Sequence, residues 1–137
     1  MSPALRIRVD PTLPAPIWSQ IEECVRYLVA SGALRPGEIV PSVRDLARDQ
    51  RVNPNTVAKA YQRLVEAGIL ETRRGEGTFV AERPPSMPPG EKARILQEGA
   101  TRYSTLAVNL GATRGEAVTT LQAAWPDHDG TSKGGKR

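Results

Sequence analysis

The stretch VNPNTVAKAYQRLV, residues 52–65, places a cluster of small polar residues directly before a run of residues with helical spacing. Asn53 is a good N-cap, and Pro54 suits the first helical position because no backbone N–H is needed there. The apolar residues that return at helical intervals, and so form the expected buried stripe, are Val57, Tyr61, Leu64 and Val65. The sequence therefore predicts a helix that opens with an exposed polar tip and ends at Ala67-Gly68.

Two helices are expected before this one. From Pro16 onward, apolar residues recur at i, i+4, i+7 and i+8, which predicts a first helix ending at Ser31-Gly32. The segment Ser42-Val43-Arg44-Asp45 matches a capping box, in which each terminal side chain satisfies the backbone N–H of the other residue, and it predicts a short second helix. Residues 1–14 are expected to be extended, with a short strand through Arg6–Val9.

The hydrophobic period changes after Gly68. Residues 69–73 and 78–81 suit short strands, and the intervening sequence RGEG at 74–77 predicts a β-hairpin with a glycine-rich tip. The side chains expected in the core of this half of the chain are Leu28, Leu46, Val57, Tyr61, Leu64 and Phe79. Trp18, at the start of the first helix, is expected to pack against the linker or a partner subunit.

A proline-rich linker, RPPSMPPG at residues 83–90, separates the hairpin from a second helical region. One helix is expected from Glu91 to Leu110, and a capping box at Thr113–Glu116 opens another. Two such helices cannot hide their apolar face alone, which indicates burial against a second copy of the chain. The residues of this predicted dimerisation face are Leu96, Tyr103, Leu106, Leu110, Val118, Leu121 and Trp125. Packing of these helices on their own N-terminal domain is the alternative.

The order helix, connector, short helix, tight turn, helix and hairpin is that of a winged helix-turn-helix domain. The predicted fold class is α+β and mostly helical, with a β-hairpin wing and a small two-helix C-terminal dimerisation region. The expected domains are a DNA-binding domain over residues 1–82, the linker at 83–90, a dimerisation region at 91–125 and a disordered tail at 126–137.

Composition narrows the function further. The formal net charge of +4 and the sequence pI of about 9.6 favour a polyanionic partner, although residues 1–83 carry twelve Lys/Arg against ten Asp/Glu. Cys24 is the single cysteine and His128 the single histidine, so we expect Cys24 to be buried and expect neither a metal site nor a cofactor. No apolar run is long enough to cross a membrane, and we expect a cytoplasmic protein.

The segment from Pro16 to Ala81 resembles the DNA-binding domain of GntR-type transcriptional regulators. The resemblance is carried by PSVRDLA, VNPNTVAKAYQRL and ETRRGEGTFV in that order. About 50 residues follow the wing, which is similar to the YtrA subfamily, whose reduced C-terminal region serves mainly for dimerisation. The resemblance implies a repressor that binds a palindromic operator in double-stranded DNA as a homodimer. The resemblance also implies possible control by a small-molecule effector, although no residue of this chain points to one.

The residues expected to contact DNA lie in the second helix, at the tip of the third helix and in the wing: Ser42, Arg44, Asn53, Asn55, Thr56, Lys59, Arg63, Arg73, Arg74, Gly75 and Gly77. Arg44 matches the family's arginine on the second helix, and Asn55 and Thr56 are poor interior helix formers that suit hydrogen bonding to bases or phosphates. For Arg63 a solvated surface role is an equal alternative. Glu76 is repelled by phosphate, so it should point away from DNA or pair with an arginine.

Two other functions compete with DNA binding. An enzyme is disfavoured, because no catalytic triad, activated cysteine or phosphate-binding glycine loop is recognisable in the sequence. A winged helix that binds proteins instead of DNA is the alternative, but the basic residues of the second and third helices and of the wing argue against it. The sequence does not identify the operator, the target genes, the sign of regulation or the role of the basic tail.

Overall fold

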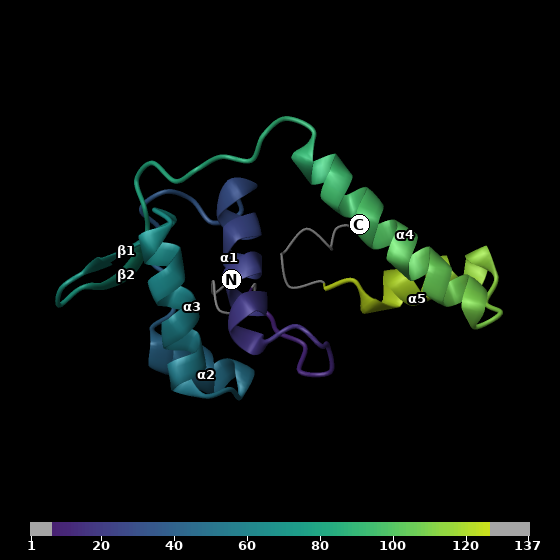
Figure 1. The fold of residues 1–137 in the computed structure, drawn as a ribbon, viewed down its shortest axis with the longest axis horizontal. Coiled ribbons are helices and arrows are strands. Elements are labelled where there is room, and N and C mark those ends of the chain that lie inside the picture. The colour runs from purple at the N-terminus through teal and green to yellow at the C-terminus, as the bar shows by residue number, and fades with distance from the viewer. Residues whose placement is uncertain (1–6, 127–137) are drawn as a thin grey trace, which may run out of the picture. The chain divides into compact units, whose positions relative to one another are not determined.

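The computed structural model describes residues 7–126 of the chain, which divide at Met87 and Pro88 into two compact units. The N-terminal unit contains three helices and a two-stranded hairpin (Figure 1). Its elements are α1 (Ile17–Ala30), α2 (Val43–Gln50), α3 (Pro54–Glu66), β1 (Leu70–Arg73) and β2 (Gly77–Val80). This order confirms the predicted winged helix-turn-helix arrangement, with the hairpin as the wing.

Helix α3 is the central element of the N-terminal unit, because it packs against both α1 and α2. Its buried stripe consists of Val57, Ala60, Tyr61 and Leu64. These residues meet Ile21 and Val25 of α1 and Leu46 of α2 in one hydrophobic core. The prediction was wrong for Val65, which is 37% exposed. Val65 lies at the edge of the stripe, and the smaller Ala60 takes the position that faces the core.

Two other expected core residues differ in their burial. Leu28 is only partly buried and packs at the margin of the core. Phe79 is not in the core; it is half-buried on the hairpin, and the guanidinium carbon of Arg73 lies 4.0 Å from its ring centroid. A long arginine side chain covers this ring, as the stems of such residues commonly do on apolar surface.

The N-terminal segment does not form the expected strand. Arg6 lies outside the described residues, and residues 7–10 have no regular secondary structure. Ile7 is nevertheless fully buried in the core. The backbone N–H of Val9 donates to Oε1 of Gln50 at 3.1 Å. A side chain of α2 therefore supplies the hydrogen-bond acceptor that a neighbouring strand would provide in a sheet.

The predicted hairpin is formed, and its register places Leu70 opposite Val80 and Arg73 opposite Gly77. The connector between α1 and α2 extends this sheet in a way that the sequence did not reveal. Gly37 N–H donates to the Val80 carbonyl, Val80 N–H to the Glu38 carbonyl, and Val40 N–H to the Thr78 carbonyl. The wing is therefore held to the helices by its second strand as well as by the chain that follows α3.

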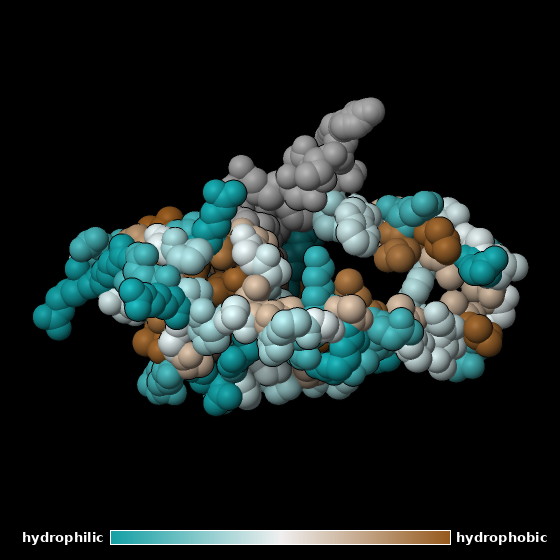
Figure 2. Space-filling view, turned by 90° about the horizontal axis from the view of Figure 1, so that it is seen from above, coloured by the Kyte–Doolittle hydropathy of each residue, from teal (hydrophilic) through white to brown (hydrophobic). Residues whose placement is uncertain are grey.

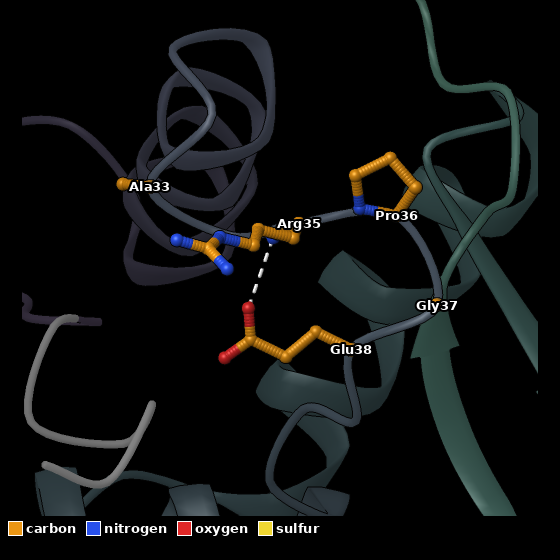
Figure 3. Close-up of a pocket in the computed structure, with 5 residues that line it drawn as sticks. All are labelled: Ala33, Arg35, Pro36, Gly37 and Glu38. Carbon is orange, nitrogen blue, oxygen red and sulfur yellow. Dashed lines mark hydrogen bonds between the residues drawn. The ribbon is translucent and has the colours of Figure 1, made fainter.

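An open hollow of about 540 Å³ lies beside the same connector, and five residues of this segment line it within the described part of the chain (Figure 3). They are Ala33, Arg35, Pro36, Gly37 and Glu38. The backbone N–H of Arg35 donates to Oε1 of Glu38 at 2.9 Å, so the segment closes on itself.

The C-terminal unit consists of α4 (Glu91–Asn109) and α5 (Arg114–Ala124). The capping box predicted at Thr113 is confirmed, with both reciprocal hydrogen bonds to Glu116 present. The Tyr103 hydroxyl donates to the Ala117 carbonyl at 2.7 Å and ties the two helices together. Trp125 is the C-terminal capping residue of α5, one position beyond the helix.

Little of the C-terminal unit is buried. Within its described part, Ala107 is the one hydrophobic residue classed as buried, and Tyr103 is half-buried. Figure 2 shows hydrophobic surface, in brown, at the C-terminal helices on the right of the view. No helix in residues 7–126 is both long and apolar enough to cross a membrane. The expected disordered tail lies outside the described residues, apart from Pro126.

Candidate nucleic-acid interface

The tip of α3 has the capped geometry that the sequence predicted. Oδ1 of Asn53 accepts a hydrogen bond from the backbone N–H of Asn55 at 2.7 Å, and Pro54 occupies the first helical position. With the cap supplied by Asn53, the exposed side chain of Asn55 has no capping task. Thr56 is half-buried beside it. The tip is thus a small polar surface whose backbone is fixed from within the helix.

A buried hydrogen bond fixes the direction in which α3 presents this tip. The Tyr61 hydroxyl donates to the Pro41 carbonyl at 2.7 Å, which ties the middle of α3 to the residue just before the cap of α2. Burial raises the pKa of Tyr61 well above its ordinary value, so the hydroxyl stays protonated and remains a donor. Helices α2 and α3 are therefore joined by polar as well as apolar contacts.

The start of α2 carries the second part of the candidate interface. The backbone N–H of Asp45 donates to Oγ of Ser42 at 3.0 Å, which confirms the cap. The reciprocal half of the predicted box is not formed, because the Asp45 carboxylate instead accepts from Arg48 at 2.7 Å, one turn along the helix. Arg44 is exposed and forms no ion pair within residues 7–126, so its guanidinium is available to a ligand.

Two cations line the flank of α3 that faces α1. Nζ of Lys59 lies 4.4 Å, and the guanidinium carbon of Arg63 4.8 Å, from the ring centroid of Trp18. Nε of Arg63 also donates to Oε1 of Glu22 at 2.7 Å, and Glu22 accepts from Arg26 at 2.8 Å. The hydrogen bond from Arg63, reinforced by Arg26, lowers the pKa of Glu22, so this carboxylate is charged at neutral pH.

These contacts change the expectations for two residues. Arg63 pairs with a carboxylate on α1 that it shares with Arg26, so it is neither simply solvated nor without a partner, while Lys59 forms no ion pair within residues 7–126. Trp18, for which the linker or a partner subunit was expected, packs against α3, because α1 lies along α3 and places its first turn beside Lys59. Glu22 was not among the expected site residues. It follows Trp18 by one helical turn, and this spacing is the sequence signal that places both side chains on the same face of α1.

The two adjacent arginines of the wing differ in their contacts. Arg73 contacts the carboxylates of Glu71 at 2.9 Å and Glu82 at 3.3 Å, and it also covers a ring of the hairpin. Arg74 is exposed and makes no ion pair in the described part of the chain. Of the two expectations for Glu76, pairing with an arginine is not formed in residues 7–126, where Arg73 contacts Glu71 and Glu82. The hydrophilic wing tip projects from the left of the molecule in Figure 2.

Two glycines form the turn of the wing, and both have a backbone conformation that other residues rarely adopt. Gly75 has φ of +79° and Gly77 has φ of +125°. A Cβ atom at Gly75 would meet nothing within 4 Å, so its glycine is needed for the turn and not for internal packing. The open space at the tip lets the backbone approach a ligand closely.

The capped tip of α3, the short preceding helix and the hairpin together define a domain of the winged helix-turn-helix class. The family model described as bacterial regulatory proteins, gntR family, matches residues 18–80. The HTH-type transcriptional repressor YtrA of Bacillus subtilis (strain 168) is 46% identical over 76 residues, which are 56% of this chain and 58% of that protein.

Two further matches extend beyond the N-terminal unit. The HTH-type transcriptional regulator Rv1152 of Mycobacterium tuberculosis (strain ATCC 25618 / H37Rv) is 37% identical over 115 residues, 84% of this chain and 90% of that protein. The solved structure of YtrA from Sulfolobus acidocaldarius, a GntR-family transcription factor, is 32% identical with a TM-score of 0.52, covering 71% of this chain and 98% of that chain. This chain belongs to the GntR family.

The chain spans little more than half of two Bacillus subtilis relatives that it matches, 58% and 56% of their lengths. The similarity to these two proteins covers 76 and 68 residues.

Proposed function

We propose that this protein is a sequence-specific DNA-binding transcriptional regulator that acts as a repressor. The observation that carries the proposal is the exposed tip of α3, where Asn55 is released from capping by Asn53 and is flanked by Lys59. Small polar side chains at a helix tip suit base-edge hydrogen bonds in the major groove. The similarity to the repressor YtrA supports the sign of regulation.

The charges around the tip suit a role in positioning the domain on the DNA backbone. Arg44 at the start of α2 and Arg74 at the turn of the wing are both exposed and lack ion pairs within residues 7–126. Phosphate contacts of this kind set the register of a domain, while base contacts supply sequence preference. A regulator of chromosomal genes acts in the cytoplasm, and we place this one there, associated with the nucleoid when bound to its operator.

We propose that two copies associate through the C-terminal unit. Its apolar side chains are exposed by 46% or more: Leu96, Leu106, Leu110, Val118, Leu121 and Trp125. An apolar surface of this extent on so small a unit is typical of an interface between subunits. Tyr103 belongs to the same face, but its hydroxyl is used within the unit by Ala117.

Dimerisation also meets an energetic need. Non-specific DNA affinity is on the order of 10⁻⁴–10⁻⁶ M, whereas specific operators are bound at roughly 10⁻⁸–10⁻¹¹ M. Two linked domains that engage both halves of a palindrome at once close this gap, because the second contact becomes intramolecular. A palindromic operator follows from the two-fold symmetry of such a dimer.

The test is selection of genomic fragments by the purified protein, followed by sequencing. We expect an enriched palindrome, and Asn55→Ala should relax its sequence while the protein stays folded. Enrichment of no sequence, even at low salt, would refute the proposal. For the dimer, Leu110→Glu should yield a monomer in analytical ultracentrifugation. Val108→Glu is the matched control, because Val108 is equally exposed but lies roughly 200° around α4 from Leu110.

A small-molecule effector would need a pocket that encloses most of its surface. Within residues 7–126, the open hollow beside Arg35 and Glu38 is lined by one connector segment and lacks the enclosed apolar walls typical of ligand sites. If an effector exists, a site between two subunits suits it better. Thermal-shift screening of metabolites with and without operator DNA tests this, and a uniformly flat response would count against it.

A further inference from the structure

Trp18 lies on the first turn of α1, outside the helix tip and the wing, yet it contacts a cationic side chain of the proposed DNA-reading helix. Nζ of Lys59 is 4.4 Å from the centroid of its ring. We propose that Trp18 is a positioning residue that holds the Lys59 ammonium at the exposed face of α3 for contact with a DNA phosphate. This inference rests on the proposed function.

Lys59 is well placed for a phosphate contact. It follows Asn55 by four residues, so both side chains share one face of α3, and both residues are exposed. Within the described residues Lys59 forms no ion pair, so its charge is not neutralised before DNA binds. A phosphate beside the base that Asn55 contacts is therefore within the reach of a lysine one turn further along.

Arg63 also contacts the Trp18 ring but has a different role. Its guanidinium carbon is 4.8 Å from the ring centroid, and its Nε donates to Glu22 at 2.7 Å. Glu22 is 9% exposed and is held by a second arginine on its own helix, Arg26. This ion-pair network fixes Arg63 and braces the indole. The cation left for DNA is Lys59, not Arg63.

The Trp18 ring helps binding because it confines the lysine in advance. A free lysine side chain has many rotamers, and it loses this freedom when it binds a phosphate. The ring attracts the ammonium on one side only, so N–H donors on the other sides can reach a phosphate oxygen while the contact persists. From the strength of exposed cation–π contacts, removal of the ring should weaken DNA binding about two- to fivefold per copy.

The test measures binding of a fluorescein-labelled duplex of mixed sequence by anisotropy at several salt concentrations. Lys59→Met should lower the salt slope by about 0.9 per copy, and Lys92→Met, which removes an exposed charge from α4, is its control. Trp18→Leu should weaken binding about two- to fivefold, whereas Trp18→Phe, which keeps an aromatic face, should retain most of the affinity. In the K59M background, Trp18→Leu should have no further effect.

A second measurement needs no DNA. The side-chain methylene protons of Lys59 should show an upfield ring-current shift by NMR, which Trp18→Leu abolishes and Trp18→Phe keeps in part. Trp18→Met serves as a second ring-free variant if Trp18→Leu does not fold. Absence of the ring-current shift in the unmodified protein would overturn the inference whatever the variants do.

The outcomes separate this inference from the proposed function. If the unmodified protein binds no duplex at low salt, the proposed function fails, and the role of Trp18 fails with it. If the protein binds DNA but Trp18→Leu weakens binding equally with and without Lys59→Met, Trp18 is merely structural and only this inference is overturned. The same holds if Trp18→Leu leaves the affinity unchanged.

Discussion

The wing offers a sharp test, because the sequence treats Arg73 and Arg74 as equivalent DNA contacts and the structure does not. Arg73 is held by Glu71 and Glu82 and covers the ring of Phe79. Arg74 is exposed, with no ion pair in the described part of the chain. We therefore expect Arg73→Ala to affect mainly the stability of the fold and Arg74→Ala mainly the affinity for DNA.

The magnitudes follow from the contacts. At an exposed site the cation–π contact of Arg73 is worth about 0.5–1 kcal/mol, and each of its two ion pairs about 0–1 kcal/mol, since its side chain is 32% exposed. Arg73→Ala should thus lower the free energy of unfolding by about 0.5–3 kcal/mol. At about 4–8 °C per kcal/mol for a domain of this size, the loss is visible as a fall in Tm. Arg74→Ala should stay within about 0.5 kcal/mol of the original protein.

The DNA assay gives the opposite order. Each lost phosphate contact lowers the slope of log affinity against log salt by about 0.9, so Arg74→Ala in a dimer with two wings should lower it by about 1.8. Arg73→Ala should change the slope less, because two carboxylates already compensate its charge. The assays are thermal unfolding and anisotropy titration at several salt concentrations. A full slope change in Arg73→Ala with no loss of stability would refute this reasoning.

Three further predictions concern the helices. Asn53→Ala removes the cap of α3 and should lower the free energy of unfolding by about 1 kcal/mol, measured with denaturant, whereas Asn55→Ala should change it by less than about 0.5 kcal/mol. Equal losses for the two variants would contradict the assignment of the cap to Asn53 and of the DNA contact to Asn55. The folded-state pKa of Glu22 lies below its ordinary value of 4.5, so its ion pair with Arg63 stabilises the fold above that value and is lost as the pH falls through the lowered pKa. Glu22→Gln should therefore flatten the acid side of the stability profile, and an unchanged profile would exclude the pair as its cause. Tyr61→Phe removes the buried hydroxyl hydrogen bond of α3 and should cost about 1 kcal/mol, which urea unfolding would measure.

Local signals in the sequence sufficed for the order and type of the elements. The cap at Asn53, the proline after it, the capping box at Thr113 and the glycine-rich turn of the wing act within a few residues of themselves. Interactions this short in range do not depend on what packs nearby, so helix starts and the hairpin could be predicted without a structure. The same holds for Val57 and Leu64, whose spacing already marks one face of α3.

Contacts between distant parts of the chain could not be predicted this way. The sequence around Ile7 suggests a strand, but Ile7 lies in the core outside any strand. The backbone N–H of the nearby Val9 is paired by the side chain of Gln50 instead of by a strand. The pairing of residues 37–40 with β2 leaves no local signal, since its hydrogen bonds join segments about 40 residues apart. Backbone groups in such a connector take whatever partner the fold brings close, and the sequence does not name it.

The residue types of the candidate interface were determined by the sequence alone, but the state of each charge was decided by tertiary structure. Arg63 and Lys59 are both basic residues on one face of a helix. Only the approach of α1 pairs Arg63 with Glu22, while Lys59 has no ion pair within residues 7–126. Likewise, adjacent arginines on the wing differ because only one side chain reaches Glu82 across the hairpin. A charge is free or compensated according to its neighbours in space, and those neighbours come from another element of the fold.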